Sequence, residues 1–213
     1  MTTEPNAEAV VPTAPDGWER PIPHFSTDPF AGQHTHHGLA SDLVRSALHK
    51  HVRMGRVEQA VRAAMELAQT DEAHEHMLWE RLRVIAAEDI GLGTPEAIAV
   101  VAALHGSAEL FGHATYERLE MAAQAAGYLA MVPKDPTVGE IMQVVLHEDR
   151  VVDIPDEAVD IHTERGQLEG RTMYDWFTTG TAVSPEVPGR DHAWHHHLAD
   201  LYFQLDPPAD GRR

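Results

Sequence analysis

Sixteen histidines stand in a chain of 213 residues, and they are the side chains most able to do chemistry. Imidazole titrates near neutral pH and binds Zn, Ni, Cu and Fe ions. Some of these histidines cluster, first in the segment HTHH and again near the C-terminal end, where an i, i+3, i+4 spacing places three on one helical face. We therefore consider a transition-metal site. Its candidate ligands are His34, His36, His162, His192, His195 and His196.

The motifs of known catalytic centres are missing from the chain. There is no HExxH zinc motif, no Walker A loop, no GxGxxG dinucleotide motif and no GxSxG nucleophile elbow. The absence of cysteine excludes disulfides, thiolate metal sites and cysteine nucleophiles. We therefore expect a protein that is not an enzyme and needs no cofactor, with histidines that lie on the surface or pack against neighbours. The alternative is a metal-dependent hydrolase or nucleic-acid enzyme that uses the clustered histidines.

A local basic cluster contrasts with the acidic chain, which carries 34 acidic and 16 basic residues and a formal net charge of -18. That charge repels phosphate backbones, so we expect DNA contact only indirectly or through this patch. The structural alternative is that the cluster pairs with Glu88, with Asp89 or with acidic residues of another subunit. Glu88 and Asp89 make a poor catalytic pair, because neighbouring helical residues point apart. The candidate contacts to a partner or to DNA are Arg45, His49, Lys50, Arg53, Arg83 and Lys134.

Apolar residues recur with the 3.6-residue period of amphipathic helices from residue 41 onward, which predicts an all-α fold, a helical bundle with irregular arms. Six helices should begin at residues 41, 57, 70 or 71, 94, 115 and 135–137. The expected N-cap of the first is Ser41. Its expected buried stripe is Leu43, Val44, Ala47, Leu48 and Val52.

One strongly apolar segment and two regions with weaker helical periodicity complete the secondary-structure prediction. The segment AIAVVAALHGSAELF is apolar nearly all round, which predicts that the fourth helix is central and buried. Further along, residues 163–180 and 191–204 indicate one helix each.

Composition divides the chain into a helical body and two irregular ends. Residues 1–38 hold six prolines, which predicts an extended arm. We place the helical domain at residues 39–183 and a proline-rich tail with a short helix at residues 184–213. The chain has no long apolar run, so we expect no signal peptide and no membrane partner, and we expect a cytoplasmic location.

Three segments of the helical body carry a family resemblance: SALHKHVR (residues 46–53), RLRVIAAEDIGLGTPEA (residues 81–97) and YLAMVPKD (residues 128–135). In this order they resemble the C-terminal region of replication-associated recombination protein A (RarA, or MgsA), an AAA+ ATPase related to clamp loaders. A fourth segment, HTERGQLEGRTMYDWFTTGTAVSP (residues 162–185), resembles the ending of small stand-alone proteins that carry only this region. The chain departs from the family at Asp135, where the family has Ser, and at Trp176, where it has His.

The resemblance implies an oligomerisation domain that builds tetramers, here without the family's ATPase module. It implies a non-catalytic homo-oligomer in DNA replication, recombination or repair that assembles or docks on a partner, such as an AAA+ ATPase or a single-strand-binding protein. A further alternative is an inhibitor that mixes into the oligomer of a cellular ATPase. The residues to which the resemblance gives a structural role are Ser46, Glu88, Asp89, Gly91, Pro133, Thr163, Gly166, Gly170 and Arg171.

Overall fold

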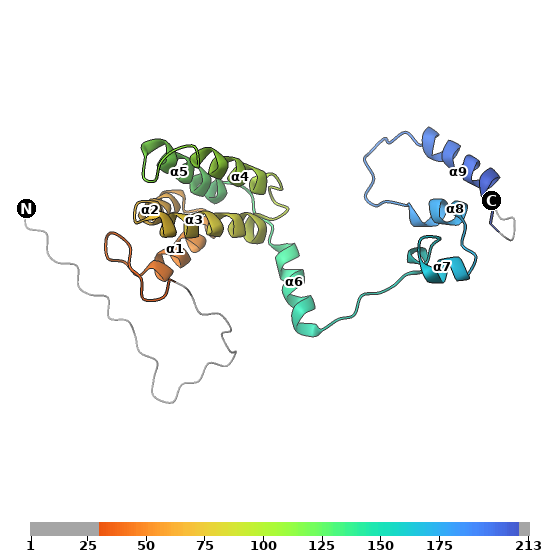
Figure 1. The fold of residues 1–213 in the computed structure, drawn as a ribbon, viewed down its shortest axis with the longest axis horizontal. Helices are drawn as coiled ribbons and strands as arrows, with labels where there is room; N and C mark the ends of the chain where they lie inside the picture. Colours follow the sequence, from red (N-terminus) through yellow and green to blue (C-terminus); the bar gives the residue numbers. More distant parts are fainter. Residues whose placement is uncertain (1–29, 209–213) are drawn as a thin grey trace, which may run out of the picture. The chain divides into compact units, whose positions relative to one another are not determined.

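The structure, a computed structural model, describes residues 30–208, and all of its regular elements are helical (Figure 1). The predicted all-α class is therefore confirmed, with no strand in the described residues and only two isolated β-bridges. The predicted arm lies mostly outside this part of the chain, at residues 1–29. No described helix is both long and apolar enough to span a membrane. The chain divides into two compact units, Met1–Glu148 and Asp149–Arg213, and each is described by itself.

Five helices of the first unit pack into a bundle (Figure 1). They are α1 (Ser41–Arg53), α2 (Val57–Ala68), α3 (Glu72–Ile85), α4 (Ala97–Ala108) and α5 (Tyr116–Met131). Each begins within three residues of the position that its periodicity and breaker residues predict. The largest buried side chain is Trp79, and the rest of the core is mainly leucine, isoleucine, valine and alanine.

Small residues bring α2 and α5 close together. Ala60 and Ala64 on α2, and Ala122 and Ala126 on α5, are fully buried. A Cβ added to Gly127 of α5 would lie 3.7 Å from a methyl group of Val61 on α2. Because neither helix presents a bulky side chain here, their backbones approach closely, as the alanine-rich pattern of the fifth predicted helix suggests.

The start of α1 differs from the prediction. Ala40, rather than Ser41, is the N-cap, and it makes no side-chain capping bond. Ser41 is buried, and its hydroxyl lies 2.8 Å from Nε2 of His74 on α3. A partner this distant in sequence therefore replaces the local cap. Leu43, predicted in the core, is 65% exposed because α1 turns Val44, Leu48 and Val52 inward instead.

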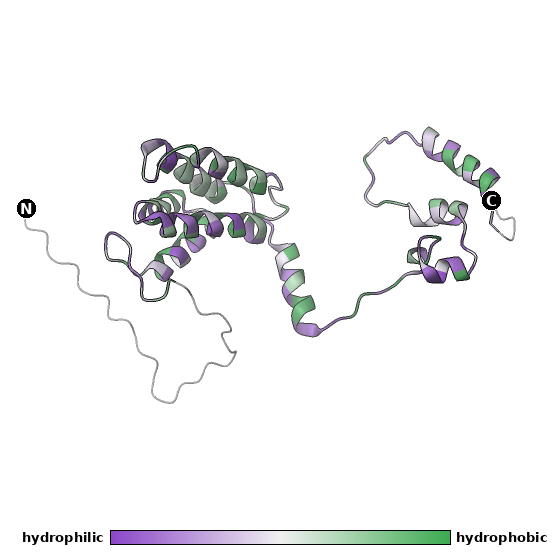
Figure 2. Cartoon of the chain, viewed as in Figure 1, coloured by the Kyte–Doolittle hydropathy of each residue, from purple (hydrophilic) through white to green (hydrophobic). Residues whose placement is uncertain are grey.

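The fourth helix is not buried all round, so that prediction is wrong. In α4 only Ala97, Val101 and Ala108 are buried, while Ile98 is 53% exposed. Periodicity cannot tell which side of an all-apolar helix the chain itself covers. Helix α6 (Thr137–Glu148), which follows α5, has no buried residue at all. Figure 2 shows apolar residues along both helices.

The second unit is made of short elements: η2 (Asp156–Ala158), α7 (Glu164–Leu168), α8 (Met173–Asp175), η3 (Trp176–Gly180) and α9 (Ala193–Leu205). The single helix predicted for residues 163–180 is wrong, because Gly170 at φ +75° ends α7 and a capping box at Thr172 starts α8. The last predicted helix is present as α9. Residues 149–183, which the sequence groups with the helical body, belong with the tail in this unit.

Four motif residues of the fourth segment hold this unit's local structure. The Thr163 hydroxyl accepts a hydrogen bond from the backbone N–H of Gly166 at 3.1 Å. A Cβ at Gly166 would lie 1.8 Å from the carbonyl oxygen of Asp160, so only glycine fits there. Nη2 of Arg171 contacts Asp156 at 2.6 Å, just after the left-handed turn at Gly170.

Candidate functional site

The three segments of the first unit that carry the family resemblance converge in space. The first lies on α1 and the second at the end of α3, where a π-helical turn, η1 (Ala86–Ile90), leads into Gly91. The third is the turn after α5. The backbone N–H of Asp135 donates to the carbonyl of Ile90 at 3.0 Å, and the Thr94 hydroxyl donates to the carbonyl of Pro133 at 3.0 Å. The motifs therefore form one structural site.

An ion cluster in which His49 and Asp89 are buried joins α1 to η1 at this site. Oδ2 of Asp89 lies 2.5 Å from Nε2 of His49, and Oδ1 of Asp89 accepts a 2.8 Å hydrogen bond from Nε of Arg53. Nη2 of Arg53 lies 2.7 Å from the same Oδ1 and 3.1 Å from Nε2 of His49. Glu88 adds a longer contact to Arg53, at 3.6 Å. Arg53 therefore makes the pairing that was expected between the basic cluster and these two acids.

The surroundings of His49 in this cluster shift its pKa. Burial lowers the pKa of His49, and the Arg53 cation adds to this effect, against the opposing influence of Asp89. Asp89 is only 5% exposed, so its carboxylate needs the arginine to offset the loss of solvation. A histidine oriented by a carboxylate is part of a catalytic triad. Here, however, the imidazole is buried and its Nε2 faces Asp89 and Arg53, which suits a structural ion cluster.

Glycine is required where η1 meets the turn after α5. Gly91 has φ +48° and ψ -131°, a conformation that side chains disfavour. A Cβ at Gly91 would lie 2.3 Å from the carbonyl oxygen of Asp135, and one at Gly93 would lie 2.7 Å from the backbone of Lys134. The two backbones therefore touch directly, which explains why glycine occupies both positions of the Gly91-Leu92-Gly93 segment.

Lys134 points back into its own helix end. Its Nζ donates to the carbonyls of Ala130 and Val132 at 3.0 and 2.9 Å, which satisfies acceptors that the end of α5 leaves open. The pKa of Lys134 is lowered, because the effect of burial outweighs the opposing effect of the negative charge of Asp89. Asp135 accepts from the backbone N–H of Thr137 at 3.0 Å and so supports the first turn of α6.

The other predicted contact residues lie apart from this cluster. Nη2 of Arg83 lies 2.7 Å from Nδ1 of His105, whose ring stacks on Trp79. Lys50 and Ser46 are exposed on α1, and Arg45 is half-buried there. The structure thus turns His49, Arg53 and Lys134 toward the chain itself, and contact with a partner or with DNA stays a prediction for the set.

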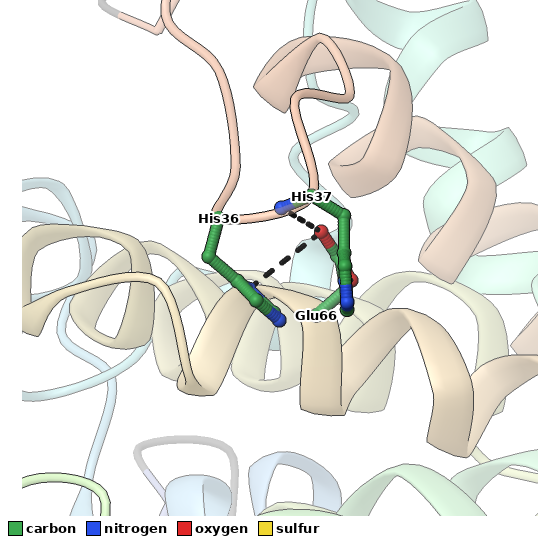
Figure 3. Close-up of side chains that lie close together, drawn as sticks. All are labelled: His36, His37 and Glu66. Carbon is green, nitrogen blue, oxygen red and sulfur yellow. Dashed lines mark hydrogen bonds and ion pairs between the residues drawn. The ribbon is translucent and has the colours of Figure 1, made fainter. Parts of the chain in front are cut away.

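Two of the predicted metal ligands, His34 and His36, belong to the first unit, and the other four belong to the second. His36 lies with His37 and Glu66, two residues that the sequence did not single out (Figure 3). His34 pairs with Ala40 in a bridge instead. In the second unit, the ring of His162 packs on Trp176. The rings of His192, His195 and His196 have centroids 6.1–6.3 Å apart.

A second buried charge cluster escaped the sequence analysis. Glu75 of α3 accepts from Nε of Arg118 at 2.6 Å and from Nε1 of Trp79 at 3.2 Å, and it contacts Nδ1 of His113 at 2.8 Å. Burial alone would raise the pKa of Glu75, but these hydrogen bonds outweigh it and lower the pKa. Helical periodicity could have indicated that Glu75 is buried, because it precedes the core residue Leu78 by three positions and therefore lies on the same helical face.

Comparisons with known proteins add no family to this geometry. No protein-family model matches the chain, and neither does any curated protein.

Proposed function

We propose that this chain is a non-catalytic helical module that assembles into a homo-oligomer, a tetramer as in the RarA C-terminal region that its motifs resemble. It would serve DNA replication, recombination or repair by docking on a partner such as an AAA+ ATPase. The observation that carries the proposal is α6, an apolar helix with no buried residue among the described residues of its unit. The resemblance supplies the proposed process.

Helix α6 exposes six large apolar side chains in three turns. Their exposed fractions run from 45% to 68%. They are Val138, Ile141, Met142, Val144, Val145 and Leu146. Burying one such side chain is worth about 1.5–3 kcal/mol, so a helix of this composition favours an apolar partner surface over water.

The exposed face of α4 offers a second apolar surface in the same unit. Ile98 is exposed on this helix together with Ala99, Ala102 and Ala103, and Leu110 follows it at 81% exposure. Small side chains allow another helix to approach closely, while Ile98 and Leu110 supply apolar area. These features are typical of a subunit interface.

The ion cluster of α1 and η1 supports a structural reading of the motif residues. The charges of Asp89 and Arg53 pair with each other inside the unit, and His49 contacts the same carboxylate. The net charge of -18 opposes binding of the phosphate backbone as well. We therefore place the partner contacts on apolar surfaces and leave DNA a secondary role.

The test is to place charge on α6. Ile141→Asp combined with Val145→Asp alters two side chains one helical turn apart, and neither is buried in the single chain. The oligomer should dissociate while the helical circular dichroism signal is kept. Gln59→Glu, at an exposed polar position of α2, is the matched control and should leave the mass unchanged. An oligomer that survives the double change would contradict a role for α6.

Docking is tested separately by mixing the purified chain with a purified RarA-type ATPase. A mixed complex that forms with the wild type and is lost with the α6 variant supports the proposal. A mixed complex with reduced ATPase activity would favour the inhibitor alternative over the scaffold.

A further inference from the structure

We propose that His36, His37 and Glu66 form a binding site for a divalent late transition-metal ion, with Zn²⁺ as the representative (Figure 3). The two histidines lie in the turn before α1, and Glu66 lies in the last turn of α2. One potential ligand atom from each residue, two imidazole nitrogens and a carboxylate oxygen, falls within 4.8 Å of the other two. Two imidazoles with one carboxylate is a ligand set of catalytic zinc sites.

The turn that carries the histidines is held in place on both sides. Within the turn, the backbone N–H of Thr35 donates to the carbonyl of Leu39 at 2.8 Å, and that of Gly38 donates to the carbonyl of Thr35 at 2.8 Å. Toward α2, the backbone N–H of His36 donates to the Thr70 hydroxyl at 3.2 Å. A turn fixed this way presents its side chains in a set position, which lowers the entropy cost of binding.

Glu66 is suited to be the anionic ligand. Its side chain is 12% exposed, and its Oε1 accepts from the backbone N–H of His37 at 3.3 Å. Burial alone would raise the pKa of Glu66, but hydrogen bonds from Thr35 and His37 outweigh it and lower the pKa. The carboxylate is therefore ionised at neutral pH, as metal coordination requires.

The distances need only small side-chain movements to admit a metal. Ligand atoms about 2.1 Å from a tetrahedral ion lie roughly 3.4 Å from one another. Nδ1 of His36 lies 3.7 Å from Oε1 of Glu66, which is close to that spacing. Nδ1 of His37 lies 2.6 Å from Oε2 of Glu66, so this hydrogen bond must open as the ion replaces the proton. His37 is exposed, which leaves its ring room to move.

The other group of potential ligands in the described residues, His49 with Glu88 and Asp89, is a poorer site. There Arg53 already lies 2.7 Å from Asp89 and supplies the positive charge. A metal ion would have to displace that arginine or lie beside it, and two cations at such a distance repel strongly. Glu66 instead pairs with histidines, which can bind a metal when neutral.

The experiment is a Zn²⁺ titration of the metal-free, tag-free full chain in competition with a chromophoric chelator, repeated with Co²⁺ followed by its visible absorption. One Zn²⁺ per chain should bind, and Co²⁺ should give the absorption of a site with nitrogen and oxygen ligands. Glu66→Gln, and separately His36→Gln with His37→Gln, should each weaken binding by roughly tenfold or more. The matched control is His76→Gln, which removes an exposed histidine 3.3 Å from Glu80 and should leave the affinity unchanged.

The control for adventitious binding is the triple change His192→Gln, His195→Gln and His196→Gln. Loss of binding in this variant with none in the double histidine variant would overturn the proposal, as would equal affinity in all variants. Should Glu66→Gln disturb the fold by circular dichroism, the double histidine variant decides, because it leaves the carboxylate in place.

Discussion

The carboxylate of Asp89 lies 2.5 Å from Nε2 of His49 and, through its other oxygen, 2.7 Å from Nη2 of Arg53. This relationship joins α1 to the π-helical turn that ends α3. The same turn contacts the segment after α5, so the ion cluster lies where three separate stretches of the chain meet. We therefore expect the stability of the first unit to depend strongly on it.

Asp89→Asn should lower the free energy of unfolding by about 1.5–3 kcal/mol, the usual contribution of hydrogen bonds to a charged group. The amide keeps the shape of the carboxylate but removes its charge, and it leaves Arg53 without its closest anion. The measurement is urea unfolding followed by circular dichroism. Glu88→Gln is the matched control, because its side chain is 50% exposed and 3.6 Å from Arg53, and it should cost less than about 0.5 kcal/mol. Similar losses in the two variants would contradict this account.

Stability should fall as the pH is lowered below about 6.5, the pKa of an exposed imidazole. Burial, with the help of Arg53, lowers the pKa of His49, so the unfolded chain takes up a proton before the folded chain does. Burial and Arg83 lower the pKa of His105 in the same way. Measured from about pH 8 to pH 5, the unfolding free energy of His49→Gln should change less steeply than that of the wild type. An unchanged slope would show that His49 is protonated alike in both states.

Gly91→Ala should destabilise the first unit by at least about 2 kcal/mol. Its backbone is at φ +48°, and the new Cβ would lie 2.3 Å from the carbonyl oxygen of Asp135. Gly106→Ala serves as the comparison, since Gly106 lies within α4 and a Cβ there meets nothing within 4 Å. That change should stabilise the helix by about 0.5–1 kcal/mol. Thermal unfolding of the two variants should therefore shift in opposite directions, and a common direction would argue against the contact.

Sequence patterns predicted most of the first unit, because its helices follow local rules. Glycine and proline mark the helix ends, and the 3.6-residue period marks the faces. The alanines of α5 predicted close packing with a neighbour, and Glu88 and Asp89 were correctly weighed as partners of the basic cluster. These features depend on residues near one another or on simple charge pairing.

Features that depend on residues far apart in the sequence could not be predicted from it. Ser41 forms a hydrogen bond with His74 instead of capping α1, and Glu75 accepts one from Arg118 at the start of α5. The histidine motif was noticed, but Glu66 comes from another helix, and no spacing in the sequence connects it with His36. The exposure of α4 was unpredictable for a further reason, since an all-apolar helix looks alike whether its own chain or another chain covers it.

The solution mass of the purified, tag-free wild-type chain, measured by light scattering, tests the central claim most directly. We expect an oligomer with a mass equal to four chains of 23.5 kDa each, because the described residues leave large apolar side chains of α4 and α6 exposed. A particle of 23.5 kDa that stays monomeric at high concentration would contradict it.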